Sequence, residues 1–91
     1  MIISRLLPAA IVPGASIFEL GENSPAIAEM QLLLGRYGYG VEASGNFDAT
    51  TRDVVTAFQR HFRPAQVDGI ADPSTIATIK AVLAARDAQG G

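Results

Sequence analysis

The chain has no cysteine, no tryptophan and only one histidine, His61, among its 91 residues. Without cysteine it cannot form a disulfide, an iron–sulfur cluster or a thiolate zinc site. A lone histidine is too few for the ligand set of a catalytic zinc, unless carboxylates fill the other positions. We therefore expect no metal and no cofactor. No apolar run approaches the ~20 residues of a membrane-spanning helix, so no transmembrane segment is expected.

Basic residues are also scarce, because seven Lys and Arg stand against nine Asp and Glu and give a formal net charge of −2. Domains that bind nucleic acid usually carry a basic surplus gathered on one face, so nucleic acid is not an expected partner. No motif supports a carboxylate pair or a Ser-His-Asp set. We assign no catalytic residue and predict that the chain is not an enzyme.

What the chain does contain is a normal share of hydrophobic residues, at 48%, which is too high for a disordered protein. The length fits one small domain. Aromatic residues make up only 7%, so the core must be mainly aliphatic.

The first 20 residues differ from the rest. Arg5 precedes a mostly apolar stretch that Pro8 and Pro13 interrupt. Such a stretch resembles a weak secretory signal, and it also suits an extended apolar linker that packs on the domain or joins it to something upstream. We assign residues 1–20 to an extended linker or leader segment and leave both alternatives open.

An internal repeat organises the remainder. Segments that begin at Gly21, Gly45 and Gly69 share one pattern, in which glycine and two further residues precede Ser or Asp and then Pro or Ala. The start positions 21, 45 and 69 are 24 residues apart. Ser and Asp are good N-cap residues, and proline is tolerated at the first helical position. Each segment therefore predicts a glycine turn followed by a helix.

Three helices are predicted, over residues 25–36, 49–62 and 73–85, because each range carries one apolar stripe at helical spacing. The stripes consist of Ile27, Met30, Leu33 and Leu34, then Val54, Val55, Phe58 and Phe62, then Ile76, Ile79, Val82 and Leu83. None of these helices could bury its stripe alone. The sequence predicts an all-α fold, a small three-helix bundle over residues 21–86, with a flexible tail at 87–91.

The order of motifs resembles the type-1 family of peptidoglycan-binding domains. The matching elements are Met30-Gln31, Tyr37-Gly38-Tyr39, Gly45-Asn46-Phe47-Asp48-Ala49-Thr50-Thr51, Ala57-Phe58-Gln59 and Asp68-Gly69-Ile70-Ala71-Asp72-Pro73-Ser74-Thr75. The stretch from Ala57 to Pro64 further looks like the C-terminal module of zinc N-acetylmuramoyl-L-alanine amidases of Gram-negative bacteria. The histidine ligands of that zinc-binding catalytic domain have no counterpart in a chain with one histidine.

The resemblance implies a non-catalytic module that binds peptidoglycan, through its glycan or its stem peptide, and targets a linked or partner cell-wall hydrolase to the polymer. It implies a bacterial cell-envelope, periplasmic location. The chain could alternatively be a helical protein-interaction module without glycan binding, which exposed apolar residues between Ile2 and Phe18 would favour. A helix-turn-helix DNA binder is disfavoured by the net charge.

Two tyrosines and a basic cluster are the candidate ligand-binding residues. Tyr37 and Tyr39 each offer a ring face and a hydroxyl, although one ring in the core and the other exposed is an alternative. Arg60, His61 and Arg63 form the densest basic cluster, and arginine suits carboxylate recognition. The alternative for that cluster is a solvated helix end, where cations are mildly stabilising.

Gln59 is a further candidate, because its amide can both donate and accept, as a sugar or peptide amide requires. The alternative is an amide bonded to a loop backbone, which ties a helix to a turn. Gln31 lies in the same kind of position on the first helix. Asp48 and Asp72 are predicted to be helix caps, and Asp68 to belong to a turn.

Overall fold

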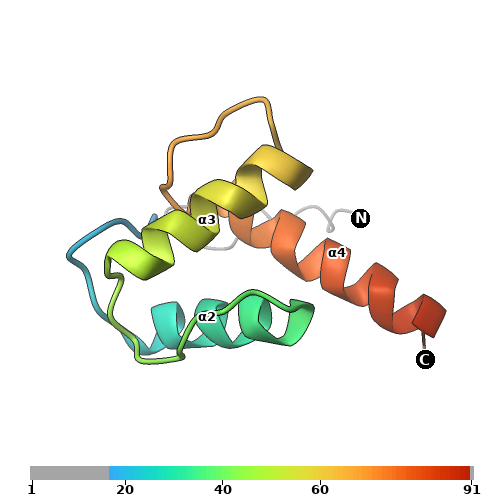
Figure 1. Ribbon diagram of the computed structural model, residues 1–91, viewed down its shortest axis with the longest axis horizontal. Coiled ribbons are helices and arrows are strands. Elements are labelled where there is room, and N and C mark those ends of the chain that lie inside the picture. Colours follow the sequence, from blue (N-terminus) through green and yellow to red (C-terminus); the bar gives the residue numbers. More distant parts are fainter. Residues whose placement is uncertain (1–16, 91) are drawn as a thin grey trace, which may run out of the picture.

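The computed structural model describes residues 17–90, which form an all-α bundle of three helices (Figure 1). They are α2 (Pro25–Tyr37), α3 (Ala49–Phe62) and α4 (Pro73–Gly90). The predicted fold class and the predicted start of every helix are confirmed. Within the described residues the extended backbone pairs only as isolated bridges, Phe18 with Ala71 and Asn23 with Asn46.

The helix starts are fixed by the predicted caps. Side-chain oxygens of Ser24, Asp48 and Asp72 each accept a hydrogen bond from the backbone N–H three residues further on, at 3.2, 2.9 and 2.8 Å. Each bond satisfies one of the N–H groups that a helix start leaves without a partner. Local chemistry is therefore sufficient to place all three starts.

The C-terminal ends differ more from the prediction. α2 ends at Tyr37 rather than at residue 36, and α4 continues to Gly90, past its expected end at residue 85. The extension includes most of the segment expected to be a flexible tail. Its exposed Asp87 carboxylate lies 3.1 Å from the Arg36 guanidinium of α2, which holds the extension beside the bundle.

The last residues of the segment assigned as linker or leader take part in the fold. Phe18 exchanges two backbone hydrogen bonds with Ala71, at 3.0 and 2.9 Å, and Gly21 donates to the Phe47 carbonyl at 2.9 Å. The pairing of Phe18 with Ala71 thus ties this segment to the turn that precedes α4. The expectations for residues 1–16, including the signal-like stretch, lie outside the described residues.

The core contains the predicted stripes and two residues from loops. Ile27, Met30, Leu34, Val55, Phe58, Ile79 and Leu83 are buried, and Leu33, Val54, Phe62, Ile76 and Val82 pack against them half-buried. Phe47 and Ala71, from the loops before α3 and α4, are also buried. The loops are therefore part of the core.

A fully buried glutamine in α2 holds the loop before α3. The Gln31 amide donates to the Asn46 carbonyl and to the Thr51 hydroxyl, both at 2.9 Å. Its oxygen accepts the Gly45 backbone N–H at 2.8 Å. One side chain thus provides partners for two backbone groups of the loop and for a buried hydroxyl in α3.

Gln59 in α3 repeats this arrangement on the loop before α4. Its oxygen accepts the backbone N–H groups of Asp68 and Gly69, at 3.0 and 2.9 Å. Its nitrogen donates to the Ile70 carbonyl at 2.9 Å and to the Thr75 hydroxyl at 3.0 Å. The side chain is fully buried. We call Gln31 and Gln59 the glutamine clamps.

Each clamp requires a glycine at a fixed place in the loop. Gly45 and Gly69 both adopt positive φ, at 85° and 75°, a backbone region that residues with a Cβ rarely enter. A Cβ on Gly69 would also lie 2.9 Å from the Thr56 hydroxyl. The repeated glycines thus let the chain turn so that its N–H faces the clamping amide.

Replacing a clamp should destabilise the domain strongly. In Gln59→Leu, two N–H groups and a carbonyl of the loop lose this partner, while the Thr75 hydroxyl keeps its bond from Arg63. Each buried polar group left without a partner costs about 1–3 kcal/mol. We expect the free energy of unfolding to fall by about 3 kcal/mol or more, measured by urea denaturation. Gln31→Leu should behave alike, whereas the exposed control Gln89→Leu should stay close to wild type. A Gln59→Leu protein as stable as that control would contradict the role of the clamp.

Stability should also fall in acid, because the cap bond from the Thr51 backbone lowers the pKa of the Asp48 carboxyl below its ordinary value of 3.8. The folded chain then binds fewer protons than the unfolded chain near that pH. The stability that Asp48 contributes is therefore present above its ordinary pKa and is lost as the pH falls through the folded-state pKa. In Asp48→Asn the amide oxygen can accept the same bond at every pH. We expect Tm measured between about pH 7 and about pH 2.5 to fall less steeply in this variant.

Candidate functional site

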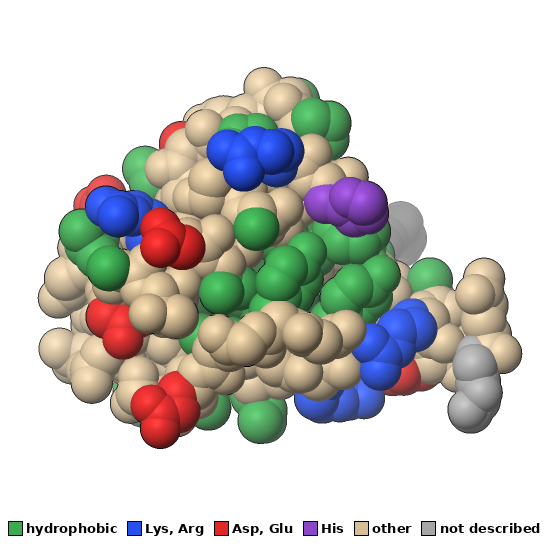
Figure 2. Space-filling model, viewed as in Figure 1, with side chains coloured by type: hydrophobic (Ala, Val, Ile, Leu, Met, Phe, Trp, Pro, Cys, Tyr) green, Lys and Arg blue, Asp and Glu red, His purple; other side chains and the backbone are tan. Residues whose placement is uncertain are grey.

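Four aromatic side chains and one arginine gather where α2 and α3 end. We call Tyr37, Tyr39, His61, Phe62 and Arg86 the aromatic surface. Figure 2 shows hydrophobic side chains between α3 and the loop that follows α2, with the histidine at one end of the patch. Ring centroids are 6.2 Å apart for the two tyrosines, 5.5 Å for Tyr37 and Phe62, and 4.4 Å for His61 and Phe62.

The end of α2 brings the two tyrosines together. Gly38 has a φ of 127° and reverses the chain, and the Tyr39 N–H then bonds the Leu34 carbonyl at 3.0 Å. The rings of Tyr37 and Tyr39 stack at an interplanar angle of 24°, and both are half-buried. The two rings are therefore neighbours at the surface, rather than one in the core and one in solvent.

Phe58 and Phe62 support the tyrosines from α3. Tyr39 meets the buried Phe58 edge-on at 6.2 Å, and Tyr37 meets Phe62 edge-on. Edge-to-face contacts of this kind are favourable beyond the area that they bury. The tyrosines are consequently held from below, which keeps one side of their rings in a fixed position.

The electrostatics of the aromatic surface favour the neutral form of the Tyr39 hydroxyl and add one cation. Burial raises the pKa of the Tyr39 hydroxyl above 10.0, and the neighbouring Tyr37 raises it further. The Arg86 guanidinium of α4 lies 5.2 Å from the Tyr37 ring centroid and donates to the Tyr37 carbonyl at 2.7 Å. The surface thus combines ring faces, hydroxyls, an imidazole and a guanidinium.

The predicted basic cluster divides into exposed and internal members. Arg60 and His61 are exposed on the last turn of α3. Arg63 points inward instead: its guanidinium lies 3.0 Å from the Asp72 carboxylate and also donates to the Thr75 hydroxyl. Its side chain is only 14% exposed, and its Nε is buried without a partner. Arg63 therefore connects the end of α3 to the start of α4.

Gln59, the remaining candidate, is occupied as a glutamine clamp. The nitrogen and the oxygen of its amide both bond the loop before α4. This is the alternative given above for Gln59, an amide that ties a helix to a turn. With no exposed surface it has no direct access to a ligand, so it is not part of the aromatic surface.

Sequence reasoning did not single out Arg86. Its contact with Tyr37 spans 49 residues and depends on the continuation of α4 past its predicted end. Nor did any motif mark it, because an arginine near the end of a helix is common. Only the packing of α4 beside α2 brings it to the tyrosines.

Within residues 17–90 no group of three His, Asp or Glu side chains is placed to hold a metal ion. No described helix combines the length and the apolar character needed to cross a membrane.

Comparison with known protein families shows to which family this chain is similar. The family model described as a putative peptidoglycan-binding domain matches residues 23–79, which confirms the resemblance indicated by the motifs. The N-acetylmuramoyl-L-alanine amidase AmiD of Escherichia coli (strain K12) is 44% identical over 59 residues. That alignment covers 62% of this chain and 20% of the amidase, so the chain spans about a fifth of this curated relative.

Several solved structures are also similar to this chain. A fused zinc-dependent amidase/peptidase/peptidoglycan-binding-domain protein from Clostridium acetobutylicum matches with TM-score 0.66 and 28% identity, over 70% of this chain and 28% of that one. The SleB N-terminal domain matches with TM-score 0.69 and 25% identity, over 75% and 93%. The Burkholderia AP3 phage endolysin matches with TM-score 0.66 and 31% identity, over 74% and 26%.

Arg86 should shield Tyr37, and the absence of tryptophan makes this measurable. The chain has two tyrosines, both in the aromatic surface, so its intrinsic fluorescence reports on that surface. In Arg86→Ala we expect acrylamide to quench tyrosine emission more efficiently, with a loss of about 0.5–1 kcal/mol in stability. Arg86→Lys keeps a cation near the ring and should be intermediate. Unchanged quenching in Arg86→Ala would show that the contact does not persist in solution.

Proposed function

Because this chain belongs to the family of putative peptidoglycan-binding domains, we propose that it is a non-catalytic module that binds peptidoglycan and targets a linked or partner cell-wall hydrolase to that polymer. The match over residues 23–79 is the observation that carries the proposal. It includes all of α2 and α3 and the start of α4, and with them both glutamine clamps.

The aromatic surface is the proposed contact with the polymer. Peptidoglycan offers sugar C–H faces, amide groups and peptide carboxylates. The stacked rings of Tyr37 and Tyr39 suit a sugar face, and their hydroxyls can bond its polar groups. Exposed Arg60 and His61 lie at the end of α3 next to Phe62, where a carboxylate or an amide could be bound.

Such a module would act by mass action rather than by chemistry. A hydrolase joined to a domain that holds the polymer meets its substrate at an increased effective concentration. Modest affinity is sufficient, because the polymer repeats the bound unit. The likeness to part of an amidase supports an N-acetylmuramoyl-L-alanine amidase as the associated enzyme, with action in the bacterial cell envelope, in the periplasm.

Co-sedimentation with insoluble peptidoglycan sacculi tests this function. We expect wild type to pellet with the sacculi, and Tyr37→Ala and His61→Ala to bind about three- to tenfold more weakly, as expected for the loss of an aromatic contact. Asp53→Ala, an exposed change on α3 outside the aromatic surface, is the matched control. Far-UV circular dichroism must show that each variant keeps its helices.

The outcomes separate the proposal from its alternative. A folded wild type that stays in the supernatant at high sacculus concentration would contradict wall binding and favour a helical protein-interaction module. If both aromatic-surface variants pellet as fully as wild type, the proposed function stands, but the aromatic surface is not the contact with the polymer.

A further inference from the structure

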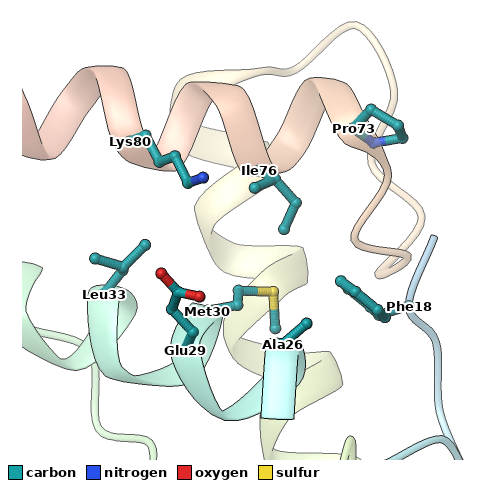
Figure 3. Close-up of a pocket in the computed structure, with 8 residues that line it drawn as sticks. All are labelled: Phe18, Ala26, Glu29, Met30, Leu33, Pro73, Ile76 and Lys80. Atoms are coloured by element: carbon teal, nitrogen blue, oxygen red, sulfur yellow. The ribbon is translucent and has the colours of Figure 1, made fainter. Parts of the chain in front are cut away.

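A second concave surface lies between α2 and α4. It is a cleft of about 150 Å³. Its lining consists of Phe18, Ala26, Glu29, Met30, Leu33, Pro73, Ile76 and Lys80 (Figure 3). The floor and walls are apolar, and no lining side chain carries a hydroxyl or an amide. We call this feature the interhelical cleft.

Opposite charges stand on the two sides of the interhelical cleft. Figure 3 shows the Glu29 carboxylate on α2 and the Lys80 ammonium on α4 pointing toward each other across its opening. Both residues are exposed, and within residues 17–90 neither forms an ion pair with another side chain. Their charges therefore remain available to a third group placed between them.

The walls of the interhelical cleft are fixed by interactions already described. Phe18 is held by its two backbone hydrogen bonds to Ala71, directly before α4. Met30 is buried in the core, and Leu33 and Ile76 pack against the same core, so the apolar floor is held by the bundle itself. The cleft is thus a built feature, and little ordering would be required when a ligand enters.

The chemistry of the cleft selects among the parts of peptidoglycan. A sugar ring is bound through hydroxyl or amide partners and through aromatic rings that stack on its faces. The lining has no hydroxyl or amide side chain, and Phe18 is its one aromatic ring. A second protein would need a far larger surface, since a specific interface buries about 800 Å² per partner. An aliphatic residue that carries both a free ammonium and a free carboxylate fits the apolar floor and the two charges.

We propose that the interhelical cleft binds the stem peptide of peptidoglycan, with the aliphatic part of an amino-acid residue on the apolar floor and its zwitterionic end between Glu29 and Lys80. The Lys80 ammonium receives the ligand carboxylate, and the Glu29 carboxylate receives the ligand ammonium. This assignment rests on the proposed function and deepens it, because it gives the stem peptide a site separate from the aromatic surface.

NMR titration of the full chain with the free tripeptide L-alanyl-γ-D-glutamyl-meso-diaminopimelate tests the assignment. Backbone shifts should concentrate at the cleft, around Glu29, Ile76 and Lys80. Lys80→Gln and Glu29→Gln should each weaken binding about two- to fivefold, the range of an exposed ion pair. Glu42→Gln, an exposed glutamate outside the cleft, is the matched control. A tripeptide acetylated on the side-chain amine of its diaminopimelate lacks the ammonium that Glu29 would receive. Wild type should therefore bind it as weakly as Glu29→Gln binds the unmodified peptide.

A third variant blocks the space and keeps both charges. Ala26 is an exposed residue in the first turn of α2 that lines the cleft, so Ala26→Leu should fill the cleft and leave the helix intact. We expect it to abolish tripeptide shifts at the cleft while its binding to peptide-free glycan strands equals wild type.

Two results would overturn the assignment. In the first, wild type pellets with sacculi but the tripeptide causes no NMR shifts at the cleft. The proposed function then stands without this site. The other is tripeptide binding by Ala26→Leu at wild-type affinity. Failure of wild type to pellet would instead remove the proposed function, and tripeptide shifts confined to the cleft would still support a zwitterion site.

Discussion

Each of the two loops that lead into α3 and α4 is tied to the preceding helix by one buried side-chain amide. Gly45 and Gly69 are buried and their backbone N–H groups bond these amides, so both N–H groups would be stranded in the core without Gln31 and Gln59. Because each amide both donates and accepts, one residue satisfies groups that would otherwise need a strand or several waters. The clamps thereby allow loop residues such as Phe47 and Ala71 to be buried.

Both proposed surfaces depend on these loops and on the position of α4. The Gln59 clamp fixes the turn that carries Ala71, and Ala71 in turn anchors Phe18 at one end of the interhelical cleft. From that turn α4 runs beside α2, so that Lys80 faces Glu29 and, further along, Arg86 covers Tyr37 (Figure 1). A domain too small for a large core thus achieves a defined surface by tying loops to helices, not by adding hydrophobic area.

The helices could be predicted from sequence because their signals are local. Caps, glycine turns and apolar stripes act over a few residues, and the predicted range 49–62 coincides with α3. The clamps were harder to assign, because the glycines repeat every 24 residues whereas Gln31 and Gln59 are 28 apart. The difference arises because Gln31 reaches Gly45 over 14 residues and Gln59 reaches Gly69 over 10. Arg63 was likewise placed in the site from its charge, which gives no sign of an internal partner such as Asp72.

The two proposed surfaces combine residues from inside and outside the family match. The match covers residues 23–79, and so includes both clamps, their glycines and the two tyrosines. Lys80, Arg86 and Asp87 lie beyond it on the rest of α4. Exposed positions there can change at little cost in stability, because neither clamp nor the buried floor of the core depends on them. The same scaffold can therefore carry different exposed side chains along the last turns of α4 without any change in the fold.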